Sequence, residues 1–266
     1  MNQVTDQQII EILRKEAVPA LGCTEPVACA LACAKCKEVL GDVPEHLDVL
    51  VSGNIYKNGM GVGIPGTGMV GLPIAAALGA VCGKSEYGLE VLKEVNVGDN
   101  LQRAKDMLGQ VKVSLKEDAP DKLYAEALAT KGNDTVKVII VHTHTNIVLV
   151  EKNGKEIFKR EFRLDTSKPE DKGPELSVKR IWDFVHQVDV KDIEFVLQGA
   201  EMNKAISAEG LKSEYGLQIG KTLKENIDKG LLEDDLLNRT LIRATAASDA
   251  RMDGCPKPVM TNSGSG

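Results

Sequence analysis

LDVLVSGNIYKNGMGVGIPGTGMVGLPIAAALGAVC, residues 47–82, is the segment from which the rest of the fold can be built. Its first six residues are mostly aliphatic and predict a buried strand at 47–52. A glycine-rich stretch from Gly59 to Gly71 follows, and the apolar run at 72–82 predicts a buried helix. The order of strand, glycine loop and helix suits a ligand site, because glycines let the backbone approach a bound group closely.

Helices are expected before this segment, and a helix with strands after it. Thr5 and Gln8 form a capping-box pattern before a first helix, and Thr24 is the expected N-cap of a second helix that runs to about Leu40. Downstream, the pattern predicts a helix at 99–108, strands at 110–115, 135–141, 146–151 and 156–162, and a hairpin turn at Asn153–Gly154.

The expected fold class is α+β, with a mainly helical catalytic portion and an inserted small α/β module that contains an antiparallel sheet. The expected divisions are an N-terminal part of the catalytic domain at 1–95, the small α/β module at 96–165, a polar linker at 166–175, and a helical part of the catalytic domain at 176–266. We expect this last part to be truncated at its C-terminus.

Composition limits the classes of function. The 266 residues carry a net charge of −6, which argues against a nucleic-acid partner, because phosphate binding needs clustered Lys and Arg. The uncharged segment 58–83 is interrupted by Pro65 and Pro73, and its apolar part is shorter than the roughly 20 residues that a membrane span requires, so no membrane partner is expected. Residues 1–20 show no apolar leader segment, which favours the cytoplasm and reduced cysteines.

Cys23 directly precedes the helix that opens with Thr24, Glu25 and Pro26. Exposed N–H groups and the helix dipole stabilise a thiolate at such a position and lower its pKa, which would prepare a base or a nucleophile. A small apolar residue that fills the turn is the alternative, and it stays open. The other three cysteines of this helix share one apolar face and are expected to be buried rather than metal-binding: Cys29, Cys33 and Cys36.

The glycine stretch contains a GxGxxG pattern at Gly61, Gly63 and Gly66. Pro65 lies inside the pattern, and no acidic residue ends a second strand about 20 residues later, so a dinucleotide site is only a weak alternative. The segment instead offers backbone N–H groups ahead of a helix start, around Gly66 and Thr67, which suits a small anion such as a substrate carboxylate.

Two further places carry candidate side chains. His142 and His144 alternate onto one face of a predicted strand, where a hydrogen-bonded or cleft-facing histidine is favoured over a metal ligand. Arg251 follows an Ala-rich helix and could hold a carboxylate through two parallel hydrogen bonds. An internal pair with Asp249 is the alternative that the sequence leaves open.

Five blocks occur in order along the chain: PALGCTEPVACALA, KNGMGVGIPGTGMVGLPIAAALGA, HTNIV, AASDARM and TNSGSG. Together they resemble the iron–sulfur L-cysteine desulfidase family, which is related to the alpha chain of iron–sulfur L-serine dehydratases. The resemblance implies a β-eliminating lyase that needs no pyridoxal phosphate. Such an enzyme converts L-cysteine, or L-serine, to pyruvate and ammonia with release of sulfide or water.

The resemblance also implies a [4Fe–4S] cluster held by three cysteines, with one iron open to the substrate. Those cysteines are expected beyond Gly266, so no metal ligand is assigned in this chain, and Cys255 receives no metal role. The resemblance makes Cys23 the candidate for removing the α-proton of the substrate. The residues that we expect to bind the substrate are Asn54, Lys57, Asn58, Gly66, Thr67, His144 and Arg251.

A different class of function is kept beside the lyase. A cofactor-free amino-acid-binding module, or an inactive truncated relative, would also account for an intact glycine loop without cluster cysteines. A small amino acid is the expected ligand in either case. A homo-oligomer, or a missing C-terminal portion or subunit, is considered as the protein partner.

Overall fold

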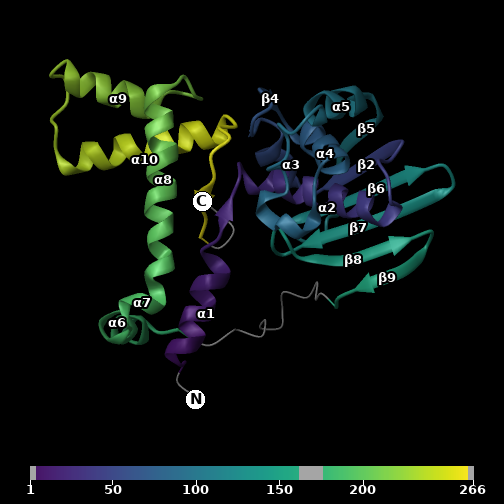
Figure 1. The fold of residues 1–266 in the computed structure, drawn as a ribbon, viewed down its shortest axis with the longest axis horizontal. Helices are drawn as coiled ribbons and strands as arrows, with labels where there is room; N and C mark the ends of the chain where they lie inside the picture. The colour runs from purple at the N-terminus through teal and green to yellow at the C-terminus, as the bar shows by residue number, and fades with distance from the viewer. Residues whose placement is uncertain (1–3, 162–175, 263–266) are drawn as a thin grey trace.

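The computed structural model describes residues 4–161 and 176–262, and these form an α+β fold, as the sequence predicted (Figure 1). The helices of the first range are α1 (Asp6–Glu16), α2 (Thr24–Leu40), α3 (Gly53–Gly59), α4 (Leu72–Val81) and α5 (Asn100–Met107), with 3-10 turns η1 (Ser85–Glu90) and η2 (Leu108–Gln110). Those of the second range are α6 (Val178–Gln187), α7 (Val190–Ile193), η3 (Glu194–Val196), α8 (Leu197–Lys212), α9 (Ile219–Asp228) and α10 (Leu236–Met252).

A six-stranded mixed sheet is the centre of the first range. Its order is β5-β2-β6-β7-β8-β9, in which β2 and β5 are parallel and the other neighbours are antiparallel. The strands are β2 (His46–Val51), β5 (Val111–Leu115), β6 (Tyr124–Lys131), β7 (Asp134–Val141), β8 (Ile147–Lys152) and β9 (Lys155–Lys159). Two short pairs complete the strands: β1 (Pro19–Ala20) with β10 (Val259–Met260), and β3 (Gly63–Ile64) with β4 (Met69–Val70).

Strand β6 is the strand of the six-stranded sheet that the sequence did not reveal. Its buried positions are Tyr124 and three alanines, Ala125, Ala127 and Ala129, and alanine favours helices over strands. The small side chains are needed because α2 packs directly across β6 and β7. Tertiary packing therefore overrides local preference in this strand.

Helices α2 and α4 cover the sheet and form the largest buried layer of the fold. Both helices are apolar on nearly all sides, and the expected buried helix at 72–82 is confirmed as α4. Their backbones approach closely at Gly79, where an added Cβ would lie 2.2 Å from the carbonyl oxygen of Ala30. In the described ranges 4–161 and 176–262, no helix is long and apolar enough to cross a membrane.

The sheet and its core join residues from both sides of the expected boundary at residue 95. Strand β2 comes from the first segment but lies between β5 and β6 of the second, and one hydrophobic cluster extends from Ala20 to Val150. How the chain divides into domains stays a prediction, and the expected linker at 166–175 lies outside the described residues.

The helices after the expected linker meet the beginning of the chain. Phe184 of α6 is buried against Ile9 and Ile10 of α1, and β1 pairs with β10. Figure 1 shows α1 between the helices α6–α10 and the half of the molecule that contains the sheet. These contacts bring the last turn of α10 to the start of α2, although the two are more than 200 residues apart.

Candidate functional site

The candidate site lies at the N-terminal end of α2, where the turn from β1 fixes Cys23. Gly22 in this turn has a φ of 75°, and a Cβ on it would lie 2.6 Å from Pro65 Cγ, so only glycine fits. Cys23, and not Thr24 as expected, is the N-cap residue of α2. The turn therefore holds the Cys23 side chain at the helix start, next to the β3–β4 hairpin.

Glu25, in the first turn of α2, links Cys23 to α3. Its Oε2 accepts a hydrogen bond from the Cys23 thiol at an Sγ–Oε2 distance of 2.8 Å, and its Oε1 accepts one from Asn58 Nδ2 at 3.1 Å. Burial raises the pKa of Glu25, but these two bonds and the nearby His144 outweigh burial and place the pKa below its ordinary 4.5. Glu25 is therefore a carboxylate at neutral pH.

The expected low pKa of Cys23 is wrong for this arrangement. Burial is the main cause that raises the pKa of the thiol to about 12, and Glu25 adds to the rise by accepting the thiol proton in a hydrogen bond and by its negative charge. The backbone N–H of Glu25 and the charge of Arg251 lower the pKa by less. Cys23 is therefore a thiol at neutral pH, hydrogen-bonded to a carboxylate.

Arg251 reaches the same place from the last turn of α10. Its Nε donates a hydrogen bond to the carbonyl oxygen of Gly22 at 3.1 Å, and its positive charge acts on both Cys23 and Glu25. The Asp249 side chain instead contacts the start of α9. Its Oδ2 accepts a hydrogen bond from the backbone N–H of Ile219 at 2.7 Å and so caps that helix. Arg251 also borders a groove of about 790 Å³ between α8 and α10.

His144 lies in the loop between β7 and β8 and interacts with Glu25. Burial lowers its pKa, and Arg251 lowers it too, while Glu25 raises it, so the neutral form is favoured at pH 7. The expectation that His142 and His144 alternate along a strand is wrong, because β7 ends at Val141 and His142 has a φ of 67°. His142 Nδ1 lies 2.6 Å from Asp121 Oδ2.

The glycine stretch is a hairpin, not the open anion-binding loop that we expected. The N–H of Gly66 donates to the carbonyl oxygen of Gly254 at 3.1 Å, and the N–H of Thr67 donates to that of Ile64, also at 3.1 Å. The Thr67 hydroxyl donates to the same Ile64 oxygen at 2.7 Å. Because these donors are used within the protein, the hairpin positions the turn after α10, and a substrate contact of Gly66 or Thr67 stays a prediction.

Three of the expected substrate-binding residues come from α3. Asn58 meets the other site residues through its bond to Glu25. Asn54 lies one helical turn earlier, and Lys57 precedes Asn58; both side chains are exposed, and their roles stay predictions. The sequence reasoning named Asn58 but not the carboxylate that it holds.

Glu25 is the site residue that the sequence analysis missed, because an acidic residue in the first turn of a helix is explained by the helix dipole alone. The available signal was its spacing from Cys23. A residue two positions after an N-cap can turn its side chain back toward the cap, and here the two side chains bond directly.

Comparison with known proteins places this chain in a family. Residues 86–266 match the model of a family described as serine dehydratase alpha chain. The chain belongs to this family. It is 48% identical over 266 residues to a UPF0597 protein of Dichelobacter nodosus, covering 99% of this chain and 61% of the relative. It is 46% identical over 262 residues to one of Actinobacillus pleuropneumoniae serotype 3, covering 98% and 60%.

A UPF0597 protein of Parabacteroides distasonis is 45% identical over 272 residues, covering 100% of this chain and 62% of the relative. The chain thus spans about three fifths of the length of these UPF0597 relatives. No solved structure matches the chain.

The described cysteines do not fit the iron–sulfur cluster that the family resemblance implies. Within 4–161 and 176–262, no group of three or more His, Cys, Asp or Glu side chains could hold a metal ion. Cys29, Cys33 and Cys36 are fully buried in α2, and Cys36 Sγ lies 3.5 Å from the carbonyl oxygen of Ala127 in the sheet. Cys255 is also buried, in the cluster between α8 and α10.

Proposed function

We propose that the protein is a β-eliminating lyase that converts L-serine or L-cysteine to pyruvate and ammonia, with release of water or sulfide. Membership of the serine dehydratase alpha chain family supports the lyase class. The meeting of Cys23, Glu25 and Arg251 at one helix end is the observation that carries the proposal. Since the chain spans about three fifths of its relatives, the activity is proposed for the whole protein.

An amino-acid substrate needs a cation for its carboxylate and a base for its α-proton. Arg251 suits the first task, because a guanidinium forms paired hydrogen bonds with a carboxylate and the bond to Gly22 anchors it beside Cys23. Cys23 Sγ is the proposed acceptor of the α-proton. Loss of the β-hydroxyl or β-thiol then leaves 2-aminoacrylate, which tautomerises and is hydrolysed by water to pyruvate and ammonia.

Cofactor, compartment and assembly belong to the proposal as well. We propose that the whole protein binds a [4Fe–4S] cluster through residues other than those described. All six cysteines are free thiols, which supports a reducing compartment, the cytoplasm. Association with a second copy, or with a further portion or subunit, stays a prediction.

Turnover by the whole protein tests the proposal. Protein expressed from the complete gene, prepared anaerobically with iron and sulfide, is expected to form pyruvate from L-cysteine, L-serine or both. Absence of pyruvate from both substrates would contradict the lyase. Heat of binding of these amino acids to the 266-residue chain, without any turnover by the whole protein, would favour the amino-acid-binding module instead.

Two substitutions assign the roles. Cys23→Ala is expected to lower kcat by at least about 10²-fold, the usual loss when a positioned base is removed. Cys82→Ala, the same change at a buried cysteine at the far end of α4, serves as the matched control and is expected to keep kcat. Arg251→Lys is expected to raise KM because a single ammonium cannot replace a planar pair of donors. Unchanged KM would remove Arg251 from the carboxylate site.

A further inference from the structure

The contact between Cys23 and Glu25 is short for a thiol. Its Sγ–Oε2 distance is 2.8 Å, whereas Cys82 Sγ lies 3.3 Å from the carbonyl oxygen of Leu78, and Cys36 Sγ lies 3.5 Å from that of Ala127. All three thiols donate to oxygen, but only Glu25 offers an ionised acceptor. Because charged acceptors shorten and strengthen hydrogen bonds, Glu25 Oε2 is a strong acceptor for the thiol proton.

The Glu25 carboxylate is held on both oxygens. Oε2 bonds Cys23, and Oε1 bonds Asn58, which projects from α3. The charged and titratable groups facing Cys23 are Glu25 and Arg251, and those facing Glu25 are Cys23, His144 and Arg251. The carboxylate therefore has a fixed orientation toward one thiol.

We propose that Glu25 is a positioning residue that acts through Cys23 by receiving the thiol proton as Sγ takes the substrate α-proton. This inference rests on the proposed function. In the step, the Cα–H bond breaks and a new S–H bond forms, while the original S–H bond breaks and an O–H bond forms at Oε2. The electron pair of the Cα–H bond becomes the second bond between Cα and Cβ.

The remaining atoms and charges balance within the same turnover. The bond from Cβ to the leaving oxygen or sulfur breaks, and the leaving atom keeps the electron pair. Water protonates the leaving group, and Glu25 returns its proton to water. The starting thiol and carboxylate are thereby restored, with the former α-proton of the substrate on Cys23.

A relay of this kind explains how a protonated thiol serves as a base. At neutral pH, a half-buried thiol beside a carboxylate supplies almost no thiolate, so removal of the α-proton by a free thiolate would be slow. If the thiol proton moves to Glu25 while the α-proton arrives, no separate thiolate is required. Glu25 is then the final proton acceptor.

The pH dependence of kcat tests the relay. Wild-type kcat is expected to be flat from about pH 6 to 9, since the proton stays within the Cys23–Glu25 pair. Glu25→Gln removes the acceptor, so kcat is expected to fall by about 10²-fold near pH 7 and to rise tenfold per pH unit as the thiol ionises to solvent. Glu25→Asp is expected to restore part of the flat profile. A Glu25→Gln profile parallel to wild type would overturn the relay.

Glu38→Gln is the matched control, because Glu38 is also a hydrogen-bonded glutamate of α2 with a lowered pKa. It lies 13 residues further along the helix, about 20 Å from Glu25 at 1.5 Å per residue. Its kcat–pH profile is expected to match wild type. A melting curve for each variant shows whether the fold is retained.

Alkylation of Cys23 by iodoacetamide, followed by mass spectrometry on the 266-residue chain, tests the pairing without substrate. Glu25→Gln is expected to speed alkylation at pH 8.5 by about tenfold or more, because loss of an adjacent negative charge lowers the thiol pKa. Faster alkylation with no turnover by the whole wild-type protein would contradict the proposed function and support the pairing. Unchanged alkylation would overturn the pairing, even if the wild type is an active lyase.

Discussion

The two ends of α2 both carry polar side chains, but they use them in different ways. At the N-terminal end, Cys23 and Glu25 meet Asn58, His144 and Arg251, which come from three other parts of the chain. At the C-terminal end, Lys37 and Glu38 of α2 bind one neighbouring segment, residues 83–85.

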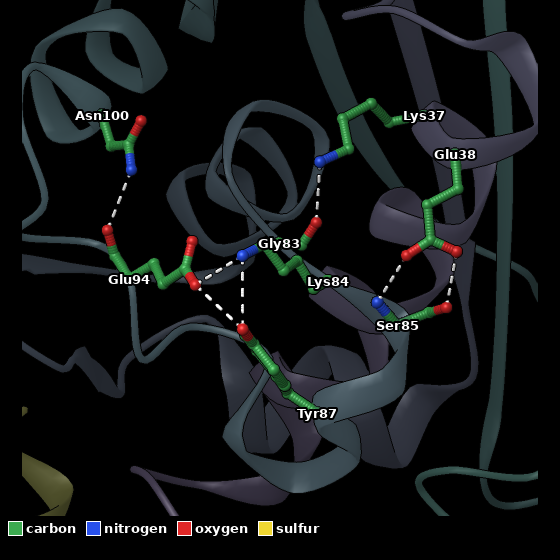
Figure 2. Close-up of polar contacts among 8 residues, drawn as sticks. All are labelled: Lys37, Glu38, Gly83, Lys84, Ser85, Tyr87, Glu94 and Asn100. Carbon is green, nitrogen blue, oxygen red and sulfur yellow. Dashed lines mark hydrogen bonds and ion pairs between the residues drawn. The ribbon is translucent and has the colours of Figure 1, made fainter.

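Figure 2 shows the C-terminal end. Lys37 Nζ donates to the carbonyl oxygen of Gly83 at 2.8 Å, just past α4, where a cation satisfies the end of a helix. The Glu38 carboxylate accepts from the Ser85 backbone N–H and hydroxyl, each at 2.6 Å, and so caps η1. Lys84 and Glu94 pair alongside at 2.7 Å.

The difference between the two ends of α2 shows how a helix end that stabilises the fold can be distinguished from one that forms a candidate active site. At the C-terminal end, Lys37 and Glu38 bond groups at the ends of helices, and Glu38 also pairs with Lys35 of the same helix at 3.2 Å. At the N-terminal end, ionisable side chains face one another, and their pKa values move in opposite directions, up for Cys23 and down for Glu25. Opposed shifts between adjacent groups are typical of proton-transfer sites.

The largest expected effect comes from a change at the packing contact between α2 and α4, because this contact supports both ends of α2. Gly79→Ala places a methyl group 2.2 Å from the Ala30 carbonyl oxygen and must push α4 away from α2. We expect a loss of roughly 3 kcal/mol in the free energy of unfolding, against a gain of about 1 kcal/mol that alanine normally gives in a helix. Urea-unfolding curves of wild type and Gly79→Ala measure this loss.

The control for this overpacking is Gly109→Ala, because no atom lies within 4 Å of a Cβ at Gly109. That variant is expected to unfold at about the wild-type urea concentration. If Gly79→Ala were equally stable, the close backbone contact between α2 and α4 would be refuted.

Glu38→Gln sharpens the comparison, since it is expected to change stability but not kcat. Its side chain is 31% exposed, so water screens part of its interaction, and we expect a loss of about 1 kcal/mol in unfolding free energy at pH 7. Because the folded-state pKa of Glu38 is lowered, its stabilisation is present above pH 4.5 and disappears as pH falls through that lowered pKa.

Urea titrations of wild type and Glu38→Gln at pH 7 and pH 3 measure this difference. The two proteins should converge in stability at the lower pH. A gap that persists or widens on acidification would mean that the Glu38 carboxylate is not what holds Ser85.

Lys84→Met gives the smallest expected effect. The Lys84–Glu94 pair lies at the surface, with side chains that are 46% and 28% exposed, and exposed ion pairs add little to stability. Its melting temperature is expected to shift by less than that of Glu38→Gln, and the difference from wild type is expected to shrink as the salt concentration rises. A larger shift than that of Glu38→Gln would make this pair, and not the Glu38 cap, the main support of the C-terminal end.

Local pattern was enough for much of the fold. Helices α2 and α4 follow from long, mostly apolar runs, because burial of a whole element leaves a signal in consecutive residues. The strand at 47–52 follows from a mostly aliphatic run in which alternate residues are buried. Strand β6 left no such signal, because its alanines report the closeness of α2 rather than a preference for strand.

By itself, the sequence determined that Cys23 precedes a helix, that a glycine-rich stretch lies between a strand and a buried helix, and that Arg251 ends another helix, since these depend on neighbouring residues. The tertiary structure alone decided that Glu25 receives the Cys23 thiol proton in a hydrogen bond and that burial raises the thiol pKa instead of lowering it. It also decided that Asn58, His144 and Arg251 surround the pair. The physical reason is that helix periodicity is a property of adjacent residues, whereas a pKa depends on the water excluded and the charges brought near by segments distant in the chain.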